Sequence, residues 1–164
     1  ANDVIGRELA PFDEKQVAEI IKQAEAPLQR KGLDLYPLRE VLRVSNWEKL
    51  GIIRQAKGLQ EGLQIIQELK GKTDQVGTAG GPAYNISWND WLNMRNLLDA
   101  SEMVGRCALE RQESRGAHYR SDFPKKNNRE YLKNFYIKRE RGEMKIYDRP
   151  VALNRLKPED IGFE

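Results

Sequence analysis

The side chains best suited to chemistry lie in one run of the chain, Glu113 to Pro124. Two arginines, the only histidine and two carboxylates fall within it, where a helical pattern gives way to a loop. Arg115 and Arg120 can each make forked hydrogen bonds to a carboxylate, and Asp122 is a local candidate. His118 can donate to a carbonyl or titrate near neutral pH. These residues form no complete catalytic set, which favours a structural or docking role.

The same run also fits a simpler interpretation, the C-terminal end of a helix. Gly116 can adopt the left-handed conformation that closes many helices. Cationic side chains are favoured near the negative end of a helix dipole, which suits the neighbouring arginines. Under both interpretations the run is a polar junction of the fold.

Other kinds of site find little support in the sequence. Gly71-Lys72-Thr73 resembles the end of a P-loop, but the first glycine of that motif would fall at Ile66, and the segment follows a helix. One cysteine and one histidine leave no convincing metal set. Cys107 is more simply a small buried residue than a nucleophile. We therefore expect no catalytic, cofactor-binding or metal-binding residue in this chain.

The elements that position the run are helical. Asp13 can cap a first helix that places apolar residues, among them Ile20 and Ile21, on one face. A later helix has Ser87 as its expected N-cap and Trp91 as its expected core anchor. Both patterns predict amphipathic helices.

Two further helices complete this part of the chain. One begins near Pro37, where proline is tolerated in a first turn, and one carries apolar residues between 59 and 69. Gly58 and Gly62 lower the helix propensity there, so either tertiary packing compensates for the loss or these glycines mark close helix contacts. We predict a mainly α fold, with an antiparallel bundle of three to four helices over residues 1–116.

The remainder of the chain differs in pattern and in charge. Residues 131–137 and 144–151 are rich in aromatic and β-branched side chains, and Gly142 between them can supply a tight turn. Residues 111–157 carry 14 Lys and Arg against 6 Asp and Glu. We expect residues 117–164 to be a basic loop and β-hairpin tail, packed on the bundle as part of one domain.

Length and composition bound the class of protein. The chain has 164 residues and 19.0 kDa, with 39% hydrophobic and 32% charged residues, which fits one domain. It contains no apolar run long enough for a spanning helix, and no signal-peptide pattern opens it. We expect a cytoplasmic location without membrane insertion, any membrane association being through partner subunits.

The run 113–124 reads Glu-Ser-Arg-Gly-Ala-His-Tyr-Arg-Ser-Asp-Phe-Pro. It strongly resembles the ESRGAHxRxDxP segment of succinate dehydrogenase and fumarate reductase flavoprotein subunits. Residues 47–54 are similar to that family's W-E-x-x-G-I-x-R turn, and residues 58–69 and 93–111 are similar to its following helices. The resemblance covers roughly residues 35 to 155 in order.

This resemblance implies the C-terminal helical domain of a larger FAD-dependent enzyme that oxidises succinate or reduces fumarate. Flavin contacts and catalytic residues would lie in preceding domains, so this chain alone should bind no FAD and have no turnover. An iron–sulfur subunit is the expected partner of the complex. The resemblance also implies a motif that braces this domain against the flavin-binding domain, made of Arg115, Gly116, His118, Arg120 and Asp122.

Two alternatives stay open. L-aspartate oxidase shares the layout, although its run typically has Gly-Leu-His where this chain has Gly-Ala-His at 116–118; adenylylsulfate reductase is a more distant relative. The other alternative is a free-standing module that binds nucleic acid through the basic segment, whose aromatic residues include Tyr131, Phe135 and Tyr136. We favour the flavoprotein domain and expect no nucleic-acid partner.

Overall fold

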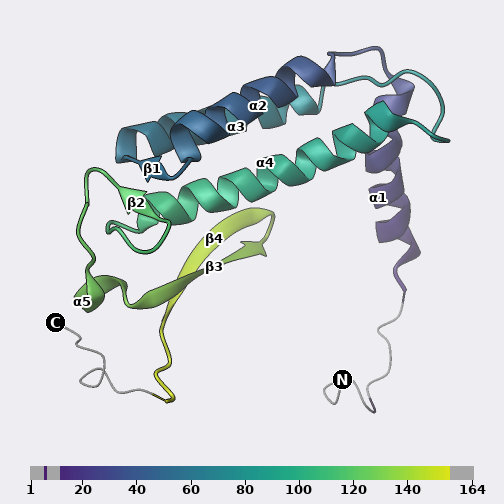
Figure 1. The fold of residues 1–164 in the computed structure, drawn as a ribbon. Coiled ribbons are helices and arrows are strands. Elements are labelled where there is room, and N and C mark those ends of the chain that lie inside the picture. Colours follow the sequence, from purple (N-terminus) through teal and green to yellow (C-terminus); the bar gives the residue numbers. More distant parts are fainter. Residues whose placement is uncertain (1–5, 7–11, 156–164) are drawn as a thin grey trace.

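The computed structural model describes Gly6 and residues 12–155; residues 1–5, 7–11 and 156–164, including the end of the predicted tail, lie outside the described residues. The mainly α fold is confirmed, with one small antiparallel sheet. Figure 1 shows the elements, which are α1 (Glu14–Glu25), the 3-10 turn η2 (Ala26–Gln29), α2 (Leu35–Leu50), β1 (Ile53–Arg54), α3 (Ala56–Thr73), α4 (Ile86–Glu110), β2 (Tyr119–Arg120), α5 (Asn128–Tyr131), β3 (Lys133–Glu140) and β4 (Glu143–Pro150).

The core lies between α2, α3 and α4, and consecutive helices run in opposite directions (Figure 1). Its buried hydrophobic residues are Leu35, Leu42, Leu50, Leu59, Ile66, Leu69, Val76, Trp91, Met94, Leu98 and Ala108. The core role predicted for Trp91 is therefore confirmed, and its indole Nε1 donates to the Thr73 carbonyl at 2.9 Å. This hydrogen bond satisfies the one polar atom of the buried ring, as a core tryptophan requires.

Small residues let the helices approach one another. A methyl group placed on Gly62 would come within 2.3 Å of Leu50 Cδ1, a distance that real side chains do not tolerate. The close contact predicted at Gly62 is confirmed. Gly58 differs, because a methyl group there would meet Gln55 Cγ at an ordinary 3.7 Å.

The start of α4 corrects one expectation. Asn85, and not Ser87, is its N-cap, and its side chain accepts a hydrogen bond from the Trp88 amide at 2.9 Å. The Asn85 amide nitrogen also donates to the carbonyls of Ala79 and Gly81, at 2.9 and 3.0 Å. Asn85 thus caps the helix and closes the glycine-rich loop before it, whereas Ser87 lies within the first turn, because the helix begins at Ile86.

Helix α1 begins where it was predicted but its apolar face is not covered. The Asp13 carboxylate accepts hydrogen bonds from the amides of Lys15 and Gln16, at 3.0 and 3.1 Å. Ile20 and Ile21 are 57% and 50% exposed, and α1 has no buried residue. Figure 1 shows α1 leading away from the other helices.

The predicted hairpin is confirmed. Strands β3 and β4 pair antiparallel from Lys133↔Pro150 to Glu140↔Glu143. Arg141 and Gly142 form the two-residue turn with φ of 51° and 87°, the double positive φ that suits the twist of a hairpin. Arg139 in this hairpin pairs with Asp99 of α4 at 2.8 Å, which fixes the sheet beside that helix.

No helix among the described residues combines the length and apolar character needed to span a membrane.

Candidate functional site

The centre of the 113–124 run is Arg120, whose side chain closes the end of α4. Helix α4 ends at Glu110, so the interpretation of Gly116 as its C-cap is wrong. Arg120 is 1% exposed, and its Nη1 donates to the carbonyls of Ala108, Leu109 and Arg111, at 2.8, 3.1 and 3.2 Å. The last carbonyls of a helix have no hydrogen-bond donor within the helix, and here one guanidinium group supplies the donors.

Asp122 neutralises this buried guanidinium and joins it to another helix. Arg120 Nε and Nη2 donate to the two oxygens of Asp122, at 2.7 and 2.8 Å, in the predicted forked geometry. The hydrogen bonds from Arg120 lower the pKa of Asp122 to about 2. Asp122 Oδ2 also accepts from the amide of Ala56, the first residue of α3, at 2.9 Å. This pair therefore binds the end of α4 to the start of α3.

Glu113 is a second carboxylate centre and is fully buried. Arg115 makes the predicted forked contact with it, at 2.7 and 3.0 Å, and the Asn127 amide donates at 2.8 Å. Arg111 donates to Glu113 as well, and also to the carbonyls of Tyr131 and Lys133. Burial would raise the pKa of Glu113, but the hydrogen bonds from Arg115, Asn127 and Arg111 lower it.

The sequence interpretation did not assign a role to Glu113 or Arg111. Both lie in the alternating sequence Arg-Gln-Glu-Ser-Arg at 111–115, which places three charged side chains at every second residue. In an extended segment, residues two apart point to the same side, so an alternation of cation, anion and cation predicts a shared contact. This alternation is visible in the sequence and could have predicted the contacts between Glu113 and its two arginines.

Gly116 and His118 belong to a tight turn after this segment. The Arg115 amide donates to the His118 carbonyl at 2.8 Å, and the His118 amide donates back at 3.0 Å. Gly116 has φ of 57°, a left-handed conformation that glycine adopts without strain. This turn is what directs the His118 ring back into the domain.

His118 is held between a carbonyl and an arginine. Its Nε2 lies 3.2 Å from the Arg111 carbonyl, and its Nδ1 lies 2.8 Å from Nη1 of Arg54. Both hydrogen bonds form only when Nε2 carries the proton and Nδ1 accepts, which assigns the neutral tautomer. Burial lowers the pKa of His118, the hydrogen bond to the Arg111 carbonyl opposes this, and the nearby arginine charges lower the pKa further, so the neutral form of the ring is favoured.

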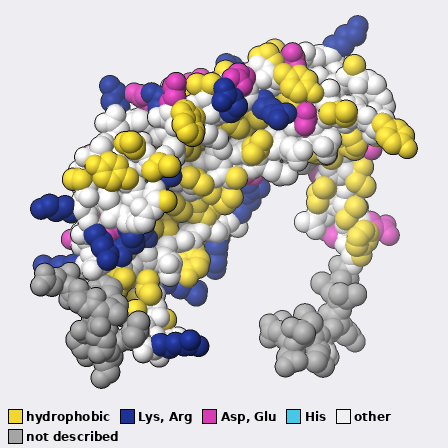
Figure 2. All heavy atoms as spheres, viewed as in Figure 1, with side chains coloured by type: hydrophobic (Ala, Val, Ile, Leu, Met, Phe, Trp, Pro, Cys, Tyr) yellow, Lys and Arg dark blue, Asp and Glu magenta, His cyan; other side chains and the backbone are white. Residues whose placement is uncertain are grey.

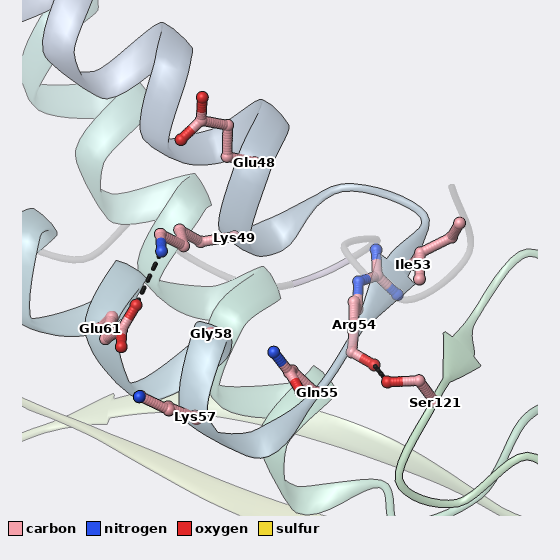
Figure 3. Close-up of a pocket in the computed structure, with 9 residues that line it drawn as sticks. All are labelled: Glu48, Lys49, Ile53, Arg54, Gln55, Lys57, Gly58, Glu61 and Ser121. Carbon is pink, nitrogen blue, oxygen red and sulfur yellow. Dashed lines mark hydrogen bonds and ion pairs between the residues drawn. The ribbon is translucent and has the colours of Figure 1, made fainter.

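A short parallel pairing brings the turn after α2 beside this run. Ile53 pairs with Tyr119 and Arg54 with Arg120, and the Ser121 amide donates to the Arg54 carbonyl at 2.8 Å. Beside Arg54 lies an open pocket of about 420 Å³ (Figure 3), where Lys49 and Glu61 pair at 2.7 Å. No group of three metal-ligating side chains occurs within the described part of the chain.

The five residues of the predicted bracing motif thus lie together, at a junction of α3, α4 and the segment leading to β3. Their contacts are with one another, with Glu113 and Arg54, and with the backbone of this same chain, and Arg120 is buried. The junction braces the domain from within.

Comparison with known proteins identifies this arrangement. The chain belongs to the family of C-terminal domains of succinate dehydrogenase and fumarate reductase flavoproteins, because the family model described as fumarate reductase flavoprotein C-term matches residues 39–162. The match contains both the turn at 47–54 and the run at 113–124.

Individual relatives agree with this assignment. An uncharacterized FAD-dependent oxidoreductase of Methanocaldococcus jannaschii is 33% identical over 143 residues, which cover 87% of this chain and 25% of the relative. An L-aspartate oxidase of Vibrio cholerae is 35% identical over 116 residues, which cover 71% of this chain and 19% of the relative. The chain therefore spans about a quarter or less of these proteins.

A solved structure has the same fold. The Mycobacterium smegmatis Sdh1 complex in its apo form superposes with a TM-score of 0.84 at 29% identity, over 99% of this chain and 29% of the matched chain. The similarity covers both the helical part and the β3–β4 hairpin, since nearly all of the chain is aligned.

Proposed function

We propose that this chain acts within a FAD-dependent flavoprotein subunit that oxidises succinate or reduces fumarate, and that it packs there against the flavin-binding domain without turnover of its own. The observation that carries the proposal is the family match, combined with a polar junction whose charged side chains are engaged inside the domain. An iron–sulfur subunit is the proposed partner of the parent, and any membrane association would come through partner subunits.

The two arginines of the 113–124 run are not free to bind FAD. A dinucleotide needs a set of donors directed at its diphosphate, but Arg115 and Arg120 are each paired with a carboxylate. FAD therefore belongs to the preceding part of the parent in this proposal. The junction of Arg115, Gly116, His118, Arg120 and Asp122 would brace that interface indirectly, by holding the surface that the flavin-binding domain contacts.

L-aspartate oxidase is the second candidate for the parent, supported by the 35% identity to the Vibrio cholerae enzyme. The Ala117 side chain, which separates the two subfamilies in our sequence interpretation, is exposed in the turn after Gly116. The substrate of the parent has to be decided by assay.

The nucleic-acid alternative has less support. Lys133 pairs with Asp148 at 2.7 Å, and Arg139 pairs with Asp99 at 2.8 Å, so part of the basic segment is already neutralised. Phe135 is covered by the Arg111 guanidinium at 4.8 Å from the ring centroid, which leaves one face of that ring unavailable for base stacking.

The test is to purify the parent flavoprotein and the 164-residue chain separately. Each is assayed for bound flavin, for succinate oxidation and fumarate reduction with an artificial electron carrier, and for oxidation of L-aspartate. We expect flavin and turnover with the parent alone, on succinate or fumarate. Turnover by the 164-residue chain would overturn the proposal, and activity of the parent on aspartate alone would favour the second candidate.

A further inference from the structure

Exposed apolar side chains gather at the end of the domain where α2 leads into β1. Trp47 is 80% exposed, Ile52 67% and Ile53 72%, and Tyr119, the strand partner of Ile53, is 40% exposed. Figure 2 shows hydrophobic side chains spread over the end of the molecule where Figure 1 places β1. Single exposed apolar residues are ordinary, but a group of four around one turn indicates a contact surface.

Arg54 lies at this surface and has no acidic partner among the described residues. Arg54 donates through Nε to the Leu50 carbonyl at 3.0 Å and contacts His118 Nδ1 through Nη1 at 2.8 Å. No carboxylate within the described ranges lies within ion-pair distance of its guanidinium. Burial lowers the pKa of Arg54, as expected for a charge that is desolvated without compensation.

Arg54 differs in this respect from the other arginines of the junction. Arg111, Arg115 and Arg120 each have a carboxylate within 2.5 to 2.7 Å. Because Arg54 is half-buried and fixed at two of its nitrogens, it is held ready for an anion from outside the domain. Apolar anchors around a central arginine are a common composition of interface hot spots.

We propose that Trp47, Ile52, Ile53 and Tyr119, with Arg54 among them, form the surface that docks on the flavin-binding domain of the parent, and that this domain presents a carboxylate to Arg54. The inference rests on the proposed function. The flavin-binding domain is the expected occupant for two reasons. The relatives carry three quarters or more of their length outside the region matched here. The missing partner of Arg54 must also be an anion.

Two residues of the bracing motif, His118 and Asp122, support this docking surface. His118 holds the Arg54 guanidinium. Ser121 binds the carbonyl of Arg54, the last residue of β1, and Asp122 binds the Ala56 amide that follows β1. His118 and Asp122 are then positioning residues of the docking surface. Their contribution to the parent is indirect and acts through Arg54 and β1.

The experiment uses the full-length parent with Ile52 and Ile53 both changed to serine, and separately with Arg54→Met. The matched control changes Tyr84 and Ile86 to serine, since these are 102% and 73% exposed and lie at the far end of α4. Hydrogen exchange over residues 52–54 and the rate of proteolysis between the domains are measured, together with flavin content.

We expect residues 52–54 to exchange much more slowly in the parent than in the 164-residue chain. Both docking variants should raise the interdomain cleavage rate by roughly tenfold or more, since loss of a hot-spot contact weakens an interface by that factor. The control should leave the rate unchanged. In the isolated chain the double serine variant should not alter thermal unfolding of the domain, which separates docking from folding. Arg54→Met also removes the hydrogen bonds to the Leu50 carbonyl and to His118, so it is compared at a temperature where the isolated domain is fully folded.

Equal exchange at residues 52–54 in parent and isolated chain would overturn the docking surface while leaving the proposed function intact. Dimerisation of the isolated chain that is lost on Ile53→Ser would replace the flavin-binding domain by a second copy, and would overturn the inference as well. A parent that carries no flavin would instead overturn the proposed function, and with it the choice of partner.

Discussion

Helix α1 and the C-terminal end of α4 are both amphipathic helical segments with polar caps, yet they are stabilised in opposite ways. At the end of α4, Arg120 satisfies three backbone carbonyls and is itself neutralised by Asp122. Helix α1 has a well-formed N-cap at Asp13 but buries no residue. The comparison teaches that capping and periodicity decide where a helix forms, whereas tertiary contacts decide how firmly it is held.

The largest effect is expected at Arg120. Replacing it by methionine leaves three backbone carbonyls at the end of α4 without their donor and removes the ion-pair partner of the partly exposed Asp122. We expect Arg120→Met to reduce the free energy of unfolding by about 3–5 kcal/mol, measured by urea denaturation of the 164-residue chain. The exposed Arg129→Met is the control and should change stability by less than about 0.5 kcal/mol. Equal effects of the two substitutions would contradict the capping role.

Acid should loosen the same junction. The pKa of Asp122 is lowered to about 2 in the folded chain, so its contribution is fully present above the unfolded value near 4 and is lost as the pH falls toward 2. Because the side chain is partly exposed, we expect about 1–2 kcal/mol from this group. Urea titrations between pH 5 and pH 2 measure it. Asp122→Asn should flatten part of this acid dependence, and an unchanged slope would refute the assignment.

The hairpin shows how much sequence reasoning recovered. The strands around Gly142 were predicted because the β-branched and aromatic alternation and the turn residue are local features. Asp13, Trp91 and Gly62 were assigned correctly for the same reason. The composition of the 113–124 run also indicated forked arginine–carboxylate contacts, which the structure contains.

Other features depend on contacts that no local pattern contains. Asp122 contacts Ala56, 66 residues earlier, and His118 contacts Arg54, 64 residues earlier. The true end of α4 was missed because its cap is a side chain ten residues beyond Glu110, rather than a glycine next to it. The exposed face of α1 was missed because periodicity predicts an apolar face without saying what covers it.

The two N-caps extend the comparison to smaller effects. Asn85→Ala removes the cap of a helix that is part of the core, so it should cost about 1 kcal/mol in global unfolding. Asp13→Ala removes an equivalent hydrogen-bonded cap from α1. Since α1 contributes no buried residue, we expect its loss to leave global unfolding unchanged within about 0.5 kcal/mol. Urea denaturation of both variants measures the difference, and equal costs would show that α1 is coupled to the core.

The smallest effect is expected on the apolar face of α1. Ile20→Ser in the isolated chain should change the free energy of unfolding by less than about 0.5 kcal/mol, because this side chain is already more than half exposed. The buried Ile66→Ser is the matched comparison and should cost several times more, since it creates a cavity and buries a hydroxyl. A large loss at Ile20 would mean that α1 packs on the domain in solution.

Native-state hydrogen exchange on the 164-residue chain tests the contrast most directly. The account predicts that amides near the end of α4, around Ala108 and Leu109, exchange only through global unfolding, with protection that falls when Arg120 is replaced. Amides of α1, around Ile20 and Ile21, should exchange by local opening at low free energy. Protection of α1 equal to that of α4, or no loss of protection at Ala108 in Arg120→Met, would contradict the account.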